Sequence, residues 1–182
     1  MTIFIDLIGS WVVRVAMISA MLGIMLTMNE AVYTTAQYAN TKAALENVTE
    51  ILSTDMNMAG NNVSGGVFYR INLGNVFFLG DLNDSGPVEQ VNYYTEYNPR
   101  TRLYALYRWV DRENFGRRLL LGKNFREVRF EYYDSEGVRV YSGHERDVVS
   151  VRVKLTMEVS GVSSNQGISS VMSDVWIYPA NL

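Results

Sequence analysis

Two ionisable residues stand inside an apolar segment at the start of the chain. Asp6 and Arg14 are the only charged residues among the first 28. A charge in a membrane segment is costly unless it reaches the interface or meets a partner, so both are candidates for a functional role. On a helix they lie about 12 Å apart along the axis, too far to pair within one chain. One interpretation is that Asp6 pairs with Arg14, or with the terminal amine, of a staggered neighbouring helix. The other is that Arg14 snorkels and Asp6 lies at the membrane interface.

A second group of candidate ligands lies at Asp81, Asn83 and Asp84. The stretch 81–86 has oxygen-bearing residues at the first, third and fifth positions of a calcium loop, and Gly86 at the sixth. Position twelve is Asn92, where an EF-hand requires a bidentate Glu. Tight turns select the same residues for conformational reasons. A turn is therefore the preferred interpretation, and a weak calcium site on these three residues is the alternative.

Catalytic groups are scarce. The one histidine, His144, lies in the polar stretch SGHERD (142–147), with no nucleophile or metal-ligand spacing around it. We expect it to be an exposed loop residue. Cysteine is absent, which excludes disulfides, thiolate metal sites and cysteine nucleophiles. The sequence therefore predicts a protein that is not an enzyme and has no cofactor, calcium at 81–84 excepted.

The apolar segment opens one long potential helix. No proline interrupts Ile3 to Gly60, a span of about 85 Å at 1.5 Å per residue. Leu7 to Met28 is apolar enough and long enough to cross about 30 Å of hydrocarbon. No basic residue precedes it, so we interpret it as a retained membrane helix and not as a cleaved signal peptide. A buried core helix of a soluble protein is the alternative.

The second half of this helix is amphipathic. One predicted apolar stripe recurs at spacings of three and four: Ala44, Val48, Ile51, Leu52 and Ala59. Gly60 then supplies a stop signal. We expect three segments: 1–28 as the membrane or filament-core half of the helix, 29–60 as its amphipathic half, and 61–182 as a β-sheet domain.

After residue 67 the pattern alternates with a period of two, which is typical of strands. We expect an α+β fold in which the long N-terminal helix packs on an antiparallel sheet of about seven strands with one polar side. The first predicted strand is 76–79. The next two are antiparallel neighbours, one with Val91, Tyr93, Thr95 and Tyr97 on one face and the other with Leu103, Ala105, Tyr107 and Trp109 on one face. The remaining predicted strands are 125–132, Val149 to Val159 and, after a polar loop at 161–170, Val171 to Tyr178.

Charge and aromatic content restrict the partners. A net charge of −3 and a pI near 5.2 argue against a general nucleic-acid binder, which would show a basic face. The twelve tyrosines fall mostly on predicted strands, where aromatic residues are favoured in any case. A carbohydrate-binding or adhesive role for them is the less favoured interpretation.

The order of parts resembles the type IV pilin superfamily. The details look most like PilW-type minor pilins and the J-type minor pseudopilin of type II secretion. The pieces that carry the resemblance are DMNMAG (55–60), DLNDSGPVEQVNYY (81–94), VRFEYYDSEG (128–137), VVSVRVKLTMEV (148–159) and WIYPANL (176–182). Pilins usually carry Glu as the fifth residue of the mature form. Here the acid is Asp6, which becomes the fifth residue if Met1 is removed. Either the numbering of this sequence starts after processing, or the chain is a leaderless relative of the family.

The resemblance implies a non-enzymatic, pilin-like structural subunit of an extracellular filament that polymerises through its N-terminal helix. Its partners would be itself or other pilins and an assembly machinery. It would be stored as a single-pass protein in the cytoplasmic membrane and would reach the cell surface on assembly. The alternatives are a minor pseudopilin of a type II secretion pseudopilus and a membrane-anchored envelope binding module that does not polymerise.

Overall fold

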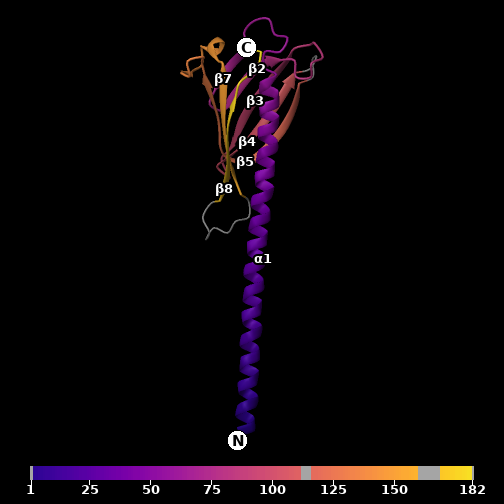
Figure 1. Cartoon of the computed structure of the whole chain (residues 1–182), viewed down its shortest axis with the longest axis vertical. Helices are drawn as coiled ribbons and strands as arrows, with labels where there is room; N and C mark the ends of the chain where they lie inside the picture. Colours follow the sequence, from indigo (N-terminus) through magenta and orange to yellow (C-terminus); the bar gives the residue numbers. More distant parts are fainter. Residues whose placement is uncertain (1, 112–115, 160–168, 182) are drawn as a thin grey trace. The chain divides into compact units, whose positions relative to one another are not determined.

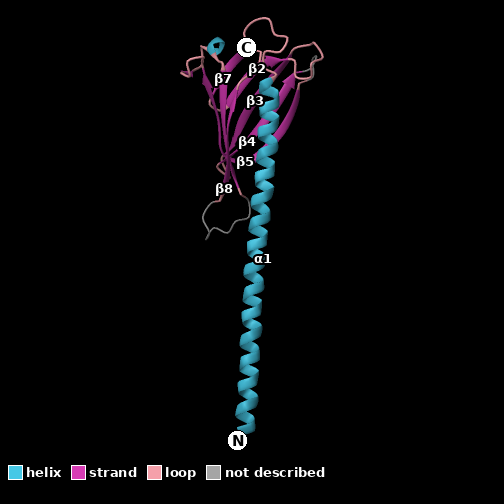
Figure 2. Ribbon diagram, viewed as in Figure 1, coloured by secondary structure: helices cyan, strands magenta, loops and turns pink. Residues whose placement is uncertain are grey.

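The chain has an α+β fold with one long helix followed by an antiparallel sheet (Figure 1). The computed structural model describes residues 2–111, 116–159 and 169–181, with side chains from Ile8 onward. Figure 2 shows the division into helix and strands. The elements are α1 (Thr2–Asn57), β1 (Phe68–Asn72), β2 (Asn75–Gly80), β3 (Glu89–Asn98), β4 (Leu103–Asp111), β5 (Arg117–Tyr133), β6 (Arg139–Val140), the short 3-10 helix η1 (Glu145–Asp147), β7 (Ser150–Glu158) and β8 (Ser170–Ile177).

The chain divides into two compact units, Met1–Ala39 and Asn40–Leu182. The first unit is helical throughout its described length, as expected from a stretch rich in good helix formers and free of proline. Its hydroxyl groups bond back to the helix: Thr27 donates to the carbonyl oxygens of Gly23 and Ile24, and Thr34 donates to that of Glu30. Such bonds satisfy the hydroxyl groups within the helix itself.

The helix ends three residues before the predicted stop at Gly60. After Asn57 the chain turns, and Gly60 has a φ of 84°. Its amide donates to the carbonyl oxygen of Leu79 at 2.9 Å, so the turn is joined to β2. A Cβ on Gly60 would also collide with the carbonyl of Asn181. Glycine is therefore required here both by conformation and by the close approach of the C-terminal segment.

The buried stripe of the helix in the second unit differs from the predicted one. Val48, Leu52 and Ala59 are buried as expected, whereas Ala44 and Ile51 are exposed. Leu45 and Met56 take their places in the core. The prediction was therefore correct at three positions and wrong at Ala44 and Ile51. The buried residues 45, 48, 52, 56 and 59 follow one another at spacings of three or four and so stay on one side of the helix.

The sheet is an antiparallel meander. Its order over the described residues is β1-β2-β3-β4-β5-β7-β8, and β6 pairs with the end of β5, which makes eight strands where about seven were predicted. The sequence pattern missed β1 and β6. β1 has two exposed residues in succession, and β6 has only two residues, so neither shows a clear period of two. The predicted polar loop at 161–170 lies outside the described residues except for its last two.

The sheet curls around a single core. The amide of Phe130 in β5 donates to the carbonyl of Leu73 at 2.9 Å, and the Tyr132 hydroxyl donates to the carbonyls of Asn72 and Asn75. The turn between β1 and β2 therefore lies against β5. Leu45, Leu52 and Met56 of α1 fill the space between the strands, together with Phe78, Tyr93, Leu106, Phe125, Phe130 and Leu155.

The inward face of β4 is the opposite of the predicted one. Leu106 and Val110 are buried and Arg108 also points inward, whereas Tyr107 and Trp109 lie on the outer face. The alternation along this strand is confirmed. The larger apolar residues lie on the outer face, however, and the inner face includes an arginine. In β7 the predicted buried face is confirmed from Val151 to Met157, while Val149 lies before the strand and is exposed.

Candidate functional site

The first candidate surface is the apolar part of α1. From Ile8 to Met28 every large apolar side chain is exposed by 42% or more, on all sides of the helix. A core helix would be mostly buried, so this exposure favours the membrane helix over the core-helix alternative. The helix is long and apolar enough to cross a membrane.

One face of this helix carries only small side chains, which sequence reasoning missed. Gly9, Ala16, Ala20, Gly23 and Thr27 follow one another at spacings of seven, four, three and four, which places them on one side. Nothing lies within 4 Å of a Cβ added to Gly9 or Gly23. Small residues on one side allow helices in a bilayer or a bundle to approach closely. The signal was present in the spacing of the glycines and alanines.

Asp6 and Arg14 are both placed on α1, and the structure does not bring them together. Arg14 is exposed, on the side of the helix opposite the small-residue face. The side chain of Asp6 lies outside the described residues. Any pairing of these two charges therefore remains a prediction about neighbouring chains.

A buried polar cluster joins the end of α1 to the sheet. Asp55 accepts hydrogen bonds from the Arg108 guanidinium through both carboxylate oxygens and from the Tyr93 hydroxyl. Tyr93 and Arg108 are directly opposite each other on β3 and β4. Desolvation and the neighbouring Asp55 charge raise the pKa of Tyr93 well above its usual value. Desolvation opposes the charge on Arg108, but its bonds to Asp55 outweigh that effect and raise its pKa.

Asp55 belongs to the DMNMAG motif, but the sequence analysis did not identify Arg108 as its partner. The position of Asp55 between the buried residues Leu52 and Met56 is the feature of the sequence that indicates a buried carboxylate. A buried carboxylate requires a cation or several donors. The inward-pointing Arg108 supplies the cation.

The candidate calcium stretch forms a turn held by Asp81. The Asp81 carboxylate is buried and accepts hydrogen bonds from the amides of Ser85 and Gly86 and from the Asn62 side chain. Desolvation would raise the pKa of Asp81, but these bonds outweigh it and hold the pKa below its usual value. Its oxygens therefore face N–H donors. Among the described residues no group of three or more His, Cys, Asp or Glu is placed to hold a metal ion.

The other two predicted ligands also accept hydrogen bonds from this turn. Asn83 Oδ1 accepts the amide of Ser85 at 3.1 Å, and Asp84 Oδ1 accepts the side-chain amide of Asn61 at 3.3 Å. These contacts agree with the preferred interpretation of 81–86 as a tight turn. The calcium alternative stays a prediction.

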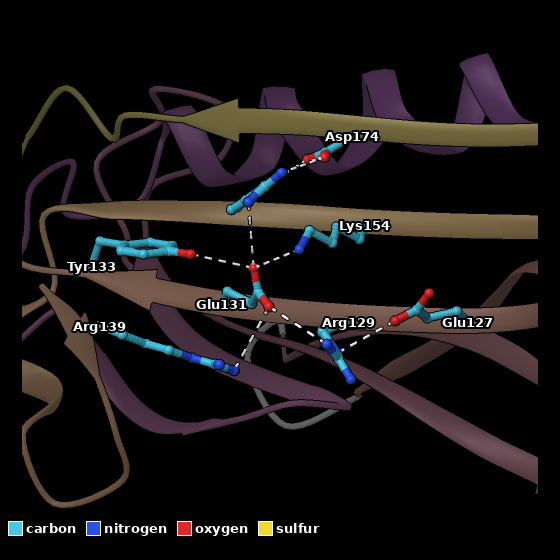
Figure 3. Close-up of polar contacts among 8 residues, drawn as sticks. Glu127, Arg129, Glu131, Tyr133, Arg139, Lys154 and Asp174 are labelled. Carbon is cyan, nitrogen blue, oxygen red and sulfur yellow. Dashed lines mark hydrogen bonds and ion pairs between the residues drawn. The ribbon is translucent and has the colours of Figure 1, made fainter. Parts of the chain in front are cut away.

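A third cluster lies on the outer face of β5, β6, β7 and β8 (Figure 3). Glu131 is 5% exposed and lies among four cations. Lys154 Nζ is 3.0 Å from its carboxylate, and the guanidinium groups of Arg129, Arg139 and Arg152 lie 3.7, 3.8 and 3.9 Å away. Tyr133 also donates to it at 3.3 Å.

Each of the four cations lies within 4 Å of at least one carboxylate. Desolvation would raise the pKa of Glu131, but its hydrogen bond to Lys154 and the surrounding cations outweigh that effect and lower it. Arg152 binds Asp174 through two hydrogen bonds of 2.8 and 2.6 Å, which lower the pKa of Asp174. The cluster is a network that joins four strands, because Glu131 lies on β5, Arg139 on β6, Arg152 and Lys154 on β7, and Asp174 on β8. The sequence carried one signal of this network: the polar face of β5 contains Glu131, and the polar face of the neighbouring β7 contains the oppositely charged Arg152 and Lys154.

His144 lies before η1, as an exposed loop residue, which confirms that prediction. Its side chain is 74% exposed, and Nδ1 is 3.4 Å from the Asp147 carboxylate. An exposed imidazole beside one carboxylate is not a catalytic arrangement in itself.

Comparison with known proteins adds no family to this description. No family model and no curated protein sequence matches the chain.

Proposed function

We propose that the chain is a membrane-stored, pilin-like structural subunit of an extracellular filament that assembles through the N-terminal part of α1. The observation that supports this most is the exposure of apolar side chains on every side of the helix from Ile8 to Met28. A surface of this kind is stable only in lipid or against other apolar helices. Among the side chains that the structure describes in the first unit, none covers this surface.

The small-residue face supports helix packing as well as anchoring. A simple anchor needs only hydrophobic length, whereas close helix–helix packing benefits from glycine and alanine on one side. Gly9 and Gly23 leave open space on that side. The opposite side carries the bulky Trp11, Ile18 and Met25.

In the proposed assembly cycle the apolar surface of α1 is covered in two different ways. Lipid covers it before assembly, and neighbouring helices replace the lipid in the fibre. Asp6 would then meet Arg14 or a terminal amine of a neighbour and set the axial stagger between subunits. Unpaired charges at that depth would oppose packing.

Electron microscopy of sheared cell-surface material with an antibody to the sheet domain tests this function. The expected result is fibres that carry the label. Label at fibre tips alone, or on short periplasmic fibres, would indicate a minor subunit or a secretion pseudopilin. Label confined to the envelope, with no fibres, would contradict the proposal and favour an anchored binding module.

A matched pair of variants sharpens the test. Gly23→Leu fills the small-residue face without a clash inside the chain, because nothing lies within 4 Å of an added Cβ. Met25→Leu changes the opposite side and keeps its bulk. Both variants should insert into the membrane, but only Gly23→Leu should lose its fibres. Normal fibres from Gly23→Leu would contradict close packing on this face.

A further inference from the structure

A polar groove lies on the outer face of the sheet, across β1, β2 and β3. It measures about 440 Å³ and is lined by Asn72, Gly74, Asn75, Asn92, Tyr94 and Thr95. The strand register explains why these residues meet. Asn75 of β2 is directly opposite Tyr94 of β3, and Asn92 precedes Tyr94 by two residues on the same face. None of the six lining residues is charged.

Two asparagine side chains in this groove have unused acceptors. The Oδ1 atoms of Asn75 and Asn92 are shielded from solvent, and no donor in the described part of the chain reaches them. A shielded acceptor without a donor destabilises the fold that contains it. The terminal torsion of asparagine is soft, so rotation about it is the low-cost route by which each carboxamide would meet a ligand in the groove.

The aromatic wall of the groove is held in place from behind. The Tyr94 ring stacks on Tyr107 with centroids 5.5 Å apart and an interplanar angle of 19°. The Arg118 guanidinium lies 3.7 Å from the centroid of the Tyr107 ring and forms an ion pair with Glu96 at 2.7 Å. This stack restricts rotation of Tyr94. An immobilised ring is a good platform for a ligand because little side-chain entropy is lost on binding.

The edge of the groove is also preformed. Asn72 Oδ1 accepts the amide of Gly74 at 3.0 Å, and the Thr95 amide donates to the carbonyl of Gly74 at 3.2 Å. A Cβ on Gly74 would lie 2.9 Å from Thr95 Oγ1, so the turn approaches β3 as closely as a glycine allows.

The geometry points to a binding site for a neutral saccharide in this groove. Sugar hydroxyls are donors and acceptors at once, so a pair of them supplies the donors that Asn75 and Asn92 lack. The apolar C–H face of a pyranose ring fits the Tyr94 ring, and an uncharged lining gives no preference for an ionic ligand. An extended peptide is a poorer occupant because the amides of β2 and β3 are used within the ladder. The site does not depend on filament assembly.

The test is calorimetric titration of the full chain in a detergent without a sugar head group. The probes are the neutral tetrasaccharides of β1,4-linked glucose and of β1,4-linked N-acetylglucosamine, with tetragalacturonate as the charged comparison. We expect saturable, weak binding of at least one neutral probe that is insensitive to salt, and no preference for the charged probe. Absence of saturable binding by both neutral probes overturns the proposal, as does binding that is lost in high salt.

Variants separate a binding role from a structural one. Asn92→Ala and Asn75→Ala should each lower the affinity about tenfold or more, while the midpoint of thermal unfolding stays unchanged or rises because a shielded, unsatisfied acceptor is removed. Gln90→Ala, an exposed amide on the outer face of the same strand, is the matched control and should bind normally. A fall in unfolding temperature for Asn92→Ala with unchanged affinity would show that the amide is bonded internally and would overturn the site.

Discussion

Arg108 and Asp55 form a two-pronged ion pair between β4 and the last turn of α1. Arg108 Nη2 lies 3.0 Å from Asp55 Oδ1, and Arg108 Nε bonds the other oxygen. The Tyr93 hydroxyl completes the set of donors. A planar guanidinium accepts only a narrow range of carboxylate orientations. The pair therefore restricts how the C-terminal part of α1, within the second unit, rotates and slides on the sheet.

Asp55→Ala should lower the free energy of unfolding by about 3 kcal/mol. That value is the low end of the range for a broken buried pair. We choose the low end because the Arg108 side chain is 23% exposed, so water partly solvates its charge when Asp55 is absent. Urea unfolding followed by near-ultraviolet circular dichroism measures it. The double variant Asp55→Ala/Arg108→Leu should cost less than the sum of the two single changes. Lys42→Ala, which removes an exposed pair with Glu46, is the control and should change little. Strict additivity of the two changes would contradict the coupling.

A fragment that starts near Glu30 should fold into a monomeric, β-rich domain that does not polymerise. The fragment contains the complete second unit and its core, and lacks the exposed apolar residues from Ile8 to Met28. Sedimentation velocity and far-ultraviolet circular dichroism check both properties. Fibres that grow from this fragment would place the assembly contacts on the sheet domain instead.

Acid should destabilise the domain in part through Glu131. The pKa of Glu131 is lower in the folded chain than the unfolded value of about 4.3. The contribution of ionised Glu131 to the stability of the fold is therefore complete above the unfolded pKa and is lost as the pH falls through the folded pKa. Glu131→Gln should be less stable than the parent at neutral pH, and the gap between their thermal midpoints should close in acid. Glu136→Gln, in an exposed turn, should show no such convergence. A constant gap at all pH values would rule out the charge as the cause.

Removal of divalent cations should leave the unfolding temperature of the domain unchanged. The Asp81 oxygens are occupied by the amides of Ser85 and Gly86 and by Asn62, so a cation has to displace these donors. A chelator titration followed by differential scanning calorimetry checks this. Asp81→Asn should lower the midpoint with or without chelator, because half of the acceptor set is lost. A rise of several degrees in millimolar calcium would instead support the ligand set Asp81, Asn83 and Asp84.

Asp6→Ala should leave the protein in the membrane with its sheet folded and should abolish or sharply reduce fibres. The neighbour's amine or Arg14 would then be buried without a counter-charge, a loss of about 3–5 kcal/mol for each broken pair. Immunoblots of membrane fractions and electron microscopy of sheared material give the two readouts. Arg14→Leu should also impair assembly if Arg14 is the partner, and should be tolerated if it snorkels. Normal fibres from Asp6→Ala would count against the pilin-like mechanism.

The fold class was predictable because it rests on long, regular patterns. The helix needed only the absence of proline and the apolar composition of its first half, and β7 showed its buried face through Val151, Val153 and Leu155. Short or irregular elements such as β6 carry too few residues for a period to appear. β6 is placed by its pairing with β5 across a short turn, whereas β1 is placed by the curl of the sheet, which brings the β1–β2 turn against β5 and is a long-range property.

The clusters were less predictable because each is made by strand register. Glu131 and Arg152 are directly opposite in β5 and β7, and Tyr93 and Arg108 are directly opposite in β3 and β4. Sequence alone gives the alternation within one strand but not the partner across the ladder. The inward Arg108 shows the consequence: its burial depends on Asp55, which comes from α1 and is not visible in the pattern of β4 itself.

The buried stripe of α1 has a mechanical consequence. Leu45, Val48, Leu52 and Met56 hold successive turns of one straight helix against the same sheet. A pulling force applied along the helix axis loads these contacts together, in shear, and the Asp55–Arg108 pair shares the load at the far end. Contacts loaded in parallel must break at once, which slows forced unfolding compared with contacts that peel apart one by one. A pull along the helix axis is therefore resisted by the buried stripe and the ion pair together.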